Sequence, residues 1–254
     1  MRDPSGRERN IQSMRRFRTI GFGVTGGLAL AAAAVLWSAP RWLIDQLARR
    51  HPGCLYRVPT RAPLVALTID DGPDSISTPL ILAELRRQEA RATFFLIAGR
   101  VRGQEQLVRA IASEGHELGN HFTRDRSSVR LSPSAFEADL LLAHEVLAPY
   151  AAVSWARPGS GWYSGAMIDV MRRHGYRCAL GSIYPYDATI PSAGFAARYI
   201  IWHTRPGAVV VLHDGGSRGR RTAQVLSEVL PELRRRGFRV VSLSELVAEA
   251  SRPS

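Results

Sequence analysis

The chain has 254 residues, with 34 basic residues against 22 acidic ones and a formal net charge of +12. This length fits one (β/α) barrel or two small domains, and the lack of internal repeats or low-complexity tracts argues against a solenoid or a fibrous protein. The positive charge is compatible with nucleic acid or with an anionic surface. However, residues 1–18 alone contribute +4, and the remaining charge is spread along the chain without an aromatic-interleaved basic stripe. We therefore predict no nucleic-acid partner and favour a polyanionic cell wall.

The stretch 19–40 contains no charged residue and is long enough to span a bilayer as a helix. The basic residues before it fit the cytoplasmic side under the positive-inside rule. A cleaved signal peptide is the alternative, although Pro40 disfavours cleavage after the small residues that precede it. We expect a basic cytoplasmic tail over 1–18, a transmembrane signal anchor over 19–40, a linker over 41–61 and a globular domain over 62–250. This order predicts a single-pass protein of the cell membrane with an extracytoplasmic domain.

Short apolar runs alternate with helical patterns after the linker. Runs of about four to six apolar residues between helices are typical of a parallel sheet. The expected strands are 63–69, 92–97, 116–119, 152–155, 177–180, 208–212 and 238–241. The expected helices are 78–88, 105–114, 133–147, 165–174, 193–203, 222–236 and 243–250, of which the third is opened by Ser132. The alternation predicts an α/β fold.

Two adjacent carboxylates, Asp70 and Asp71, follow the first apolar run, and Gly72 and Pro73 then end it. Neighbouring carboxylates repel each other, so an ordinary strand end gains nothing from them. The pair is explained if one carboxylate binds a metal and the other handles a proton. A solvated turn is the alternative, because Asp-Gly is common in turns. Residues at other strand ends favour the first interpretation.

Matching chemistry follows three further apolar runs. His121 and Asp125 are four residues apart, so an imidazole and a carboxylate can meet at one metal if the backbone turns once between them. Arg157 lies beside a glycine-rich turn, and His213 ends an apolar strand. Strand ends converge on one mouth of a (β/α) barrel, so we expect these side chains to share one site.

These motifs resemble the polysaccharide deacetylase family, the NodB homology domain of carbohydrate esterase family 4. The family's first motif, T-F-D-D-G, is matched by residues 68–72, with Ile69 in place of Phe. Its arginine-proline motif is met by Arg157-Pro158, and its late leucine-histidine motif by Leu212-His213. The resemblance covers roughly residues 60 to 250.

The chain departs from this family at three places. His121 matches the first histidine of the H-S/T-x-x-H motif, but Asp125 stands where the second histidine would be. Ser160 replaces the tyrosine that usually follows the arginine-proline motif. The D-x-x-D-W motif is not recognisable in its expected region, residues 181–187. The last two departures indicate a substrate groove that differs from the usual one.

The resemblance implies a distorted (β/α)7-8 barrel, preceded here by the single N-terminal transmembrane helix. It also implies a metal-dependent hydrolase that removes acetyl groups from N-acetylated cell-envelope polysaccharide, either peptidoglycan or a chitin-like glycan, by cleaving a non-peptide carbon–nitrogen amide bond. Acetyl-ester and cyclic amide substrates stay open. The alternative is a catalytically silent glycan-binding or scaffolding protein on the same fold. The expected partners are an acetylated glycan and the membrane.

The resemblance and the chemistry of the side chains together assign roles. Asp71, His121 and Asp125 would hold a divalent metal, with Zn²⁺ first and Mn²⁺, Co²⁺ or Mg²⁺ also acceptable because Asp125 offers a harder oxygen ligand. Asp70 would act as the base, and His213 would protonate the leaving amine. Three further residues would support these groups. Arg157 would pair with Asp70, a backbone N–H near Ser160 would hold the oxyanion together with the metal, and Asp187 would tune His213.

The sequence holds two cysteines, Cys54 and Cys178. Two cysteines do not make a disulfide framework. A bridge between them and a pair of free thiols, with Cys178 buried in its strand, both stay open.

Overall fold

A computed structural model describes residues 41–50 and 53–251 of the chain. The expected cytoplasmic tail and signal anchor, 1–18 and 19–40, lie outside these residues. Within the described part, no helix has the length and apolar character needed to cross a bilayer. Contacts divide the chain between Leu43 and Ile44, and the whole sheet belongs to the second unit.

The second unit is built on one parallel sheet of eight strands, as the alternation of strands and helices predicts. The strand order is β1-β6-β5-β4-β3-β2-β7, with β8 pairing with β2. Two isolated bridges, Arg57 with Ala208 and Ile183 with Val210, connect the β1 and β6 side to β7 and curve the sheet toward a distorted barrel. The strands are β1 Cys54–Leu55, β2 Leu64–Gly72, β3 Thr93–Leu96, β4 Glu117–Asn120, β5 Trp155–Ala156, β6 Arg177–Ala179, β7 Val209–His213 and β8 Arg239–Val241.

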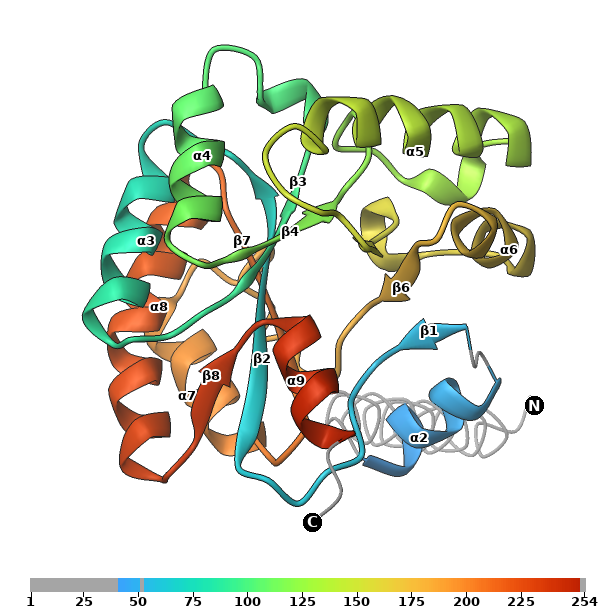
Figure 1. Ribbon diagram of the computed structural model, residues 1–254. Helices are drawn as coiled ribbons and strands as arrows, with labels where there is room; N and C mark the ends of the chain where they lie inside the picture. The colour runs from blue at the N-terminus through green and yellow to red at the C-terminus, as the bar shows by residue number, and fades with distance from the viewer. Residues whose placement is uncertain (1–40, 51–52, 252–254) are drawn as a thin grey trace, which may run out of the picture. The chain divides into compact units, whose positions relative to one another are not determined.

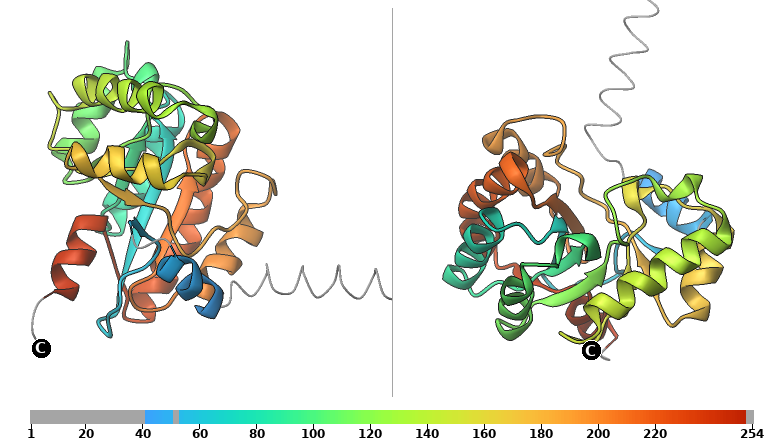
Figure 2. Two further views of the ribbon diagram at one scale, coloured as in Figure 1. Left: turned by 90° about the vertical axis from the view of Figure 1, so that its right-hand side faces the viewer. Right: turned by 90° about the horizontal axis from the view of Figure 1, so that it is seen from above.

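Helices cover the outside of the strands. In Figure 1, α3, α7 and α8 lie on one side of β2 and β7, and α5 and α6 lie on the other side. The views in Figure 2 show the same helices surrounding the strands. The α-helices are α2 Arg41–Arg50, α3 Ser77–Arg87, α4 Glu105–Ser113, α5 Pro133–Leu147, α6 Gly165–Arg173, α7 Ala193–His203, α8 Gly216–Arg235 and α9 Leu243–Ala250. Within residues 41–50 and 53–251, short 3₁₀ turns follow strand ends or join loops, at η1 Ala98–Arg100, η2 Ser128–Arg130 and η3 Gly159–Gly161.

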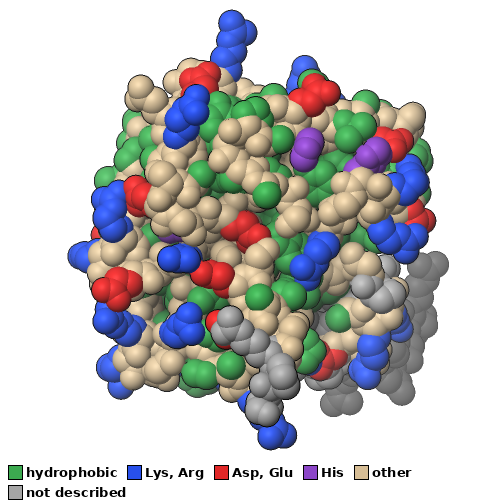
Figure 3. Space-filling model, viewed as in Figure 1, with side chains coloured by type: hydrophobic (Ala, Val, Ile, Leu, Met, Phe, Trp, Pro, Cys, Tyr) green, Lys and Arg blue, Asp and Glu red, His purple; other side chains and the backbone are tan. Residues whose placement is uncertain are grey.

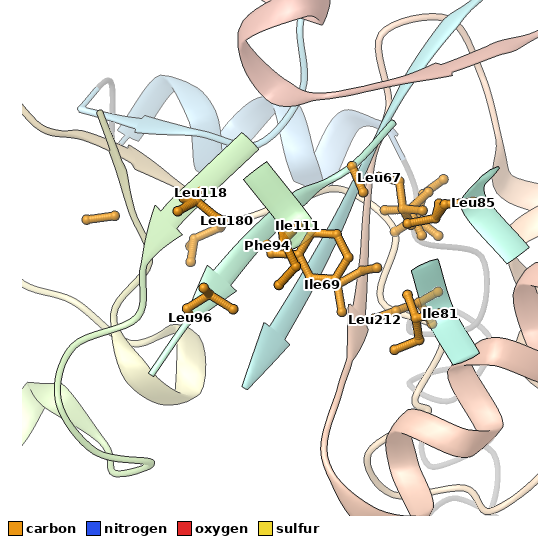
Figure 4. Close-up of a cluster of buried hydrophobic side chains, with 14 of the residues drawn as sticks. Leu67, Ile69, Ile81, Leu85, Phe94, Leu96, Ile111, Leu118, Leu180 and Leu212 are labelled. Atoms are coloured by element: carbon orange, nitrogen blue, oxygen red, sulfur yellow. The ribbon is translucent and has the colours of Figure 1, made fainter. Parts of the chain in front are cut away.

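Strand β2 is buried along its whole length and has two distinct faces. Leu67 and Ile69 belong to the main core, where Leu212 of β7 and Leu85 of α3 also lie (Figure 4). Leu64 and Ala66 belong to a second cluster, together with Phe95 and Trp155. Successive side chains of a strand point to opposite faces, so Thr68 and Asp70 continue the face of this second cluster. The alternation therefore carries Asp70 to the inner side of the barrel.

The structure differs from the sequence prediction at several elements. Strand β2 continues to Gly72 rather than ending at residue 69, because Gly72 still pairs with Leu96 of β3. Strand β1 lies inside the predicted linker 41–61, and it belongs to the sheet because Cys54 pairs in register with Cys178. Helix α8 begins at Gly216 rather than at 222, since the two glycines there are also typical of a turn. Strand β5 begins at Trp155 rather than at 152, because only from Trp155 does it find partners on β6. The expected helices 133–147, 193–203 and 243–250 are confirmed.

The charged side chains are scattered over the face seen in Figure 3. Arginines lie mostly toward its edges and alternate there with acidic side chains. Interspersed charges of both signs keep a surface soluble without creating one strong field.

Candidate active site

The carboxyl ends of the strands carry the predicted site residues. Asp70 and Asp71 lie at the end of β2, and the pairing of β2 with β3 shifts register between Asp70 and Gly72. Asp71 has a φ of 71°, in the left-handed region that is uncommon for a residue other than glycine. In a regular strand the two carboxylates would point to opposite faces. The bulge at Asp71 removes this alternation, so both buried carboxylates enter the same site.

Arg157 follows β5 and holds Asp70. Its Nη1 lies 2.5 Å from Asp70 Oδ1 and also donates to Thr68 Oγ1 at 2.9 Å. Its Nε and Nη2 donate to the carbonyl oxygens of Ala179 and Leu180 at the end of β6. Arg157 and Asp70 are both buried, and a buried ion pair holds its geometry only when its remaining donors are satisfied. Arg157 therefore fixes the orientation of Asp70.

His121 follows β4 and faces Asp71. Its Nε2 lies 3.4 Å from Asp71 Oδ1, and its Nδ1 lies 2.6 Å from the carbonyl oxygen of Arg157. Burial opposes the charged form of Asp71, but the hydrogen bond with His121 and the nearby positive charges outweigh it and lower the pKa of Asp71 to about 2. Burial likewise opposes protonation of His121, and Asp71 and Asp70 raise its pKa nevertheless. The two side chains form a buried, complementary pair.

His213 ends β7 and is the register partner of Asp70 on β2. Its Nδ1 lies 3.0 Å from Asp187 Oδ2, and its backbone N–H donates to the same oxygen at 3.0 Å. Burial lowers the pKa of His213, but the hydrogen bond and charge of Asp187, with further help from Asp70 and Asp71, raise it to about 9. The contact of Asp187 with His213 places an acid in the region where the family's D-x-x-D-W motif is not recognisable.

Asp125 does not join Asp71 and His121 as a third neighbour. Its side chain is 53% exposed, and its Oδ2 lies 3.4 Å from Arg100 Nη2 and 3.8 Å from Arg218 Nη2. Arg218 also reaches Asp71, with 3.2 Å between Nη1 and Oδ2. A guanidinium therefore lies between the two carboxylates that the sequence predicts as ligands of one metal. No group of three His, Cys, Asp or Glu side chains within 41–50 and 53–251 is placed to share a metal ion.

Two of the predicted ligands nevertheless have the chemistry that a divalent cation requires. If Nδ1 of His121 donates to the Arg157 carbonyl, Nε2 is the nitrogen that is left to bind a metal. Asp71 offers an ionised carboxylate beside it. Arg218 supplies a positive charge to the same carboxylate in this structure. The donor set fits a metal through Asp71 and His121, while Asp125 is engaged by arginines.

Ser160 lies in the turn η3, where it adopts a left-handed φ of 64°. The backbone N–H of Gly159 donates to Ser128 Oγ, and that of Gly161 donates to the Pro158 carbonyl. The N–H groups on both sides of Ser160 are thus already engaged. The N–H of Ser160 itself therefore fits best the predicted backbone donor near this residue.

Arg100 and Arg218 are site residues that the sequence prediction missed. Arg218 stands in the basic run 218–221 that follows the predicted acid His213, so its position after a strand end was the available signal. Arg100 belongs to η1 after β3 and also donates to the backbone carbonyl of Asp71. Buried Asp214, which accepts hydrogen bonds from Ser77 and Thr78, joins the end of β7 to the start of α3 and supports the bulged segment.

Comparison with known proteins points to the same family as the motifs at the strand ends. The profile of the family described as polysaccharide deacetylase matches residues 57–179. A peptidoglycan-N-acetylglucosamine deacetylase of Bacillus cereus is 33% identical over 195 residues, which are 76% of this chain and 92% of that protein. A chitooligosaccharide deacetylase of Bradyrhizobium sp. is 31% identical over 196 residues, 72% of this chain and 90% of that protein.

Solved structures show the same fold. The crystal structure of a peptidoglycan N-acetylglucosamine deacetylase in complex with an N-hydroxybenzamide compound aligns with a TM-score of 0.73 and 26% identity, covering 77% of this chain and 93% of that one. A family 4 acetyl xylan esterase from Clostridium thermocellum, in complex with a cobalt ion, aligns with a TM-score of 0.68 and 29% identity, covering 75% and 93%. The two relatives from Bacillus cereus and Bradyrhizobium sp. are more than 30% identical to this chain and match it over 92% and 90% of their own length. The family's motifs also lie together at the strand ends, so the chain belongs to the polysaccharide deacetylase family.

Proposed function

We propose that this protein is a metal-dependent deacetylase that removes acetyl groups from N-acetylated glycans of the cell envelope. The observation that carries the proposal is the pairing of Asp70 with His213 across neighbouring strands. The guanidinium of Arg157 lies beside Asp70. The hydrogen bond and charge of Asp187 raise the pKa of His213 to about 9, so the ring is protonated at neutral pH. One site thus presents a carboxylate base and an imidazolium acid, the two groups that amide hydrolysis needs.

Each residue then has a defined task. Asp70 accepts the proton of the attacking water while Arg157 holds the carboxylate in place. His213 donates its proton to the leaving nitrogen, and Asp187 stabilises the charged ring before the transfer. The Ser160 N–H would donate to the oxygen that becomes negative. The resulting products are acetate and an amine on the sugar.

Asp71 and His121 would hold the metal, with Asp125 as the third ligand once Arg218 leaves it. A bound divalent cation would act as a Lewis acid toward the carbonyl oxygen and the water. Zn²⁺ is the first candidate for a nitrogen and oxygen donor set, with Mn²⁺, Co²⁺ or Mg²⁺ as alternatives. The cobalt ion in the related acetyl xylan esterase supports a cation on this fold.

The substrate class is inferred from the relatives. Enzymes named for peptidoglycan and for chitooligosaccharides both match over most of their length, and N-acetylglucosamine is a sugar that the two polymers share. From the charge-free stretch 19–40 we infer that the domain lies outside the cell membrane, and we propose peptidoglycan as its first candidate substrate.

A catalytically silent glycan-binding protein is the second candidate, and the position of Arg218 favours it. If the guanidinium stays between Asp71 and Asp125, it blocks the metal. A pseudoenzyme of carbohydrate esterase family 4 from Bacillus anthracis aligns with a TM-score of 0.71 and 22% identity, so the same fold occurs without activity.

Acetate release separates the two candidates. The full-length protein in detergent is freed of metal with a chelator, supplied with Zn²⁺, Mn²⁺, Co²⁺ or Mg²⁺ in turn, and incubated with chitooligosaccharides, peptidoglycan or acetyl xylan. We expect acetate from the N-acetylated glycans with at least one cation, and none from Asp70→Asn. Glycan binding without acetate release, equal in the native protein and in Asp70→Asn, would establish the silent alternative.

A further inference from the structure

Cys54 and Cys178 meet in the interior although they are far apart in sequence. They are register partners on the parallel strands β1 and β6, which lie side by side in Figure 1. Their sulfur atoms are 2.8 Å apart, and both side chains are buried. No other cysteine exists in the chain, so neither has another partner within it.

The backbone geometry suits a covalent bond between them. Neighbouring strands of a sheet lie about 4.7–4.9 Å apart, which is inside the roughly 4.4–6.8 Å range of Cα separations that disulfides span. The register sets the two Cβ atoms on the same side of the sheet, and the facing sulfurs confirm that the side chains point toward each other. The pair therefore needs no movement of the backbone to become bonded.

We propose that Cys54 and Cys178 form a disulfide that ties the first strand to the barrel. The oxidant is a disulfide donor, either a dithiol-disulfide protein or a small disulfide such as oxidised glutathione. One cysteine thiolate attacks the donor and the second resolves the mixed disulfide, so one S–S bond forms in the protein and one breaks in the donor. The two cysteine protons end on the two thiols released from the donor, which is reduced while the protein is oxidised.

The disulfide would stabilise the attachment of β1 to the sheet. Strand β1 has only two residues and pairs with β6 alone among the named strands, so few hydrogen bonds hold it. Leu180 N–H donates to the Leu55 carbonyl, and Arg57 pairs with Asp45 of α2 at 2.6 Å. Strand β1 joins the sheet to the part of the chain that precedes it. A crosslink between residues 124 positions apart would keep β1 paired with β6 even when the few hydrogen bonds of β1 break.

Mass spectrometry of the full-length protein tests the bond. The protein is denatured in iodoacetamide without reductant, digested, and compared with a sample that was reduced first. We expect one linked peptide that contains Cys54 and Cys178, no alkylation before reduction and two alkylated cysteines after it. A protein isolated in reduced form is first refolded with oxidised and reduced glutathione, so the result does not depend on the compartment in which it was made.

Thermal unfolding provides the second measurement. Reductant should lower the Tm of the native protein by about 5–15 °C, from the usual stabilisation by a disulfide and the usual Tm change per unit of free energy. It should leave the Tm of the double variant Cys54→Ser, Cys178→Ser unchanged. Complete alkylation of both cysteines after refolding in oxidised glutathione overturns the proposal. Disulfide-linked dimers in place of the internal peptide would do the same.

Discussion

Asp70 and His213 are register partners on β2 and β7, so a buried carboxylate and an imidazole stand next to each other across two neighbouring parallel strands. Each has its own oppositely charged partner behind it, Arg157 for Asp70 and Asp187 for His213. Each partner places an opposite charge directly beside its group, at 2.5 Å for Arg157 and Asp70 and at 3.0 Å for Asp187 and His213. The arrangement is suited to taking a proton from one atom and giving a proton to another.

Loss of the base should abolish most of the activity without loss of the fold. We expect Asp70→Asn to lower kcat by about 10²–10⁴-fold, the usual range for a lost acid–base group. Asp71 and His121 are unchanged in this variant, so metal content measured by atomic absorption should stay the same. Asp169→Asn, which removes an exposed carboxylate paired with Arg172, is the matched control and should keep full activity. A fully active Asp70→Asn would show that another group is the base.

The alkaline limit of the rate should be set by His213. Its pKa is raised from 6.5 to about 9, so the acid is present at neutral pH and kcat should fall as pH rises through about 9. Asp187→Asn removes the main cause of the increase, and the alkaline limb should move toward lower pH. Glu228→Gln on the exposed face of α8 should leave the limb in place. A pH–rate profile that is identical for Asp187→Asn and the native protein would contradict the assigned role.

The same group makes stability depend on pH. The pKa of His213 is higher in the folded state than its ordinary value of 6.5, so the protonated ring stabilises the fold fully below pH 6.5. This contribution is lost as pH rises through about 9. The free energy of unfolding, measured in urea at a series of pH values, should therefore fall over this window in the native protein. The fall should be smaller in Asp187→Asn, and an equal fall in both proteins would count against the ion pair.

Arg218 should compete with a metal. Its guanidinium holds Asp71 and Asp125, so a cation must displace a positive charge before it can use both carboxylates. We expect Arg218→Gln to tighten Zn²⁺ binding by about tenfold in isothermal titration calorimetry, since nearby like charges disfavour each other. Arg220→Gln removes the same charge from an exposed position of the same helix and should leave the Kd unchanged.

A double variant tests whether Asp125 becomes a ligand. If it does, adding Asp125→Asn to Arg218→Gln should cancel the gain in affinity, because the two positions act through one cation. An unchanged gain in the double variant would exclude Asp125 from the metal site. Equal Kd values for Arg218→Gln and the native protein would exclude the competition itself.

The helix-facing side of the sheet should dominate stability. Leu85 of α3 is fully buried in the main core, whereas Leu142 of α5 is 54% exposed. Leu85→Ala should cost about 2–5 kcal/mol, as expected for truncation of a buried leucine. Leu142→Ala makes the same chemical change on a helix surface and should change the free energy of unfolding, measured by urea denaturation, by less than about 0.5 kcal/mol. Similar losses for the two variants would mean that α3 does not pack as described.

The sequence alone determined the order of the strands and helices that follow the predicted linker 41–61, and the residues at the strand ends, but not strand β1. Apolar runs and helical periodicity are local properties, so the predicted helices 133–147 and 193–203 match the structure. The rule that strand ends converge was enough to group Asp70, His121 and His213 before any contact was known. Residues in a known motif are found by their spacing, which requires no tertiary information.

Only the tertiary structure decided how these groups face one another. In a regular strand the side chains of Asp70 and Asp71 would point to opposite faces of the sheet. The left-handed bulge at Asp71 brings both carboxylates to the same site. Arg218 between Asp71 and Asp125, and Cys54 beside Cys178, depend on contacts between residues far apart in sequence. Such contacts follow from strand order, register and loop path, which arise when the whole barrel closes and leave no periodic signal in the chain.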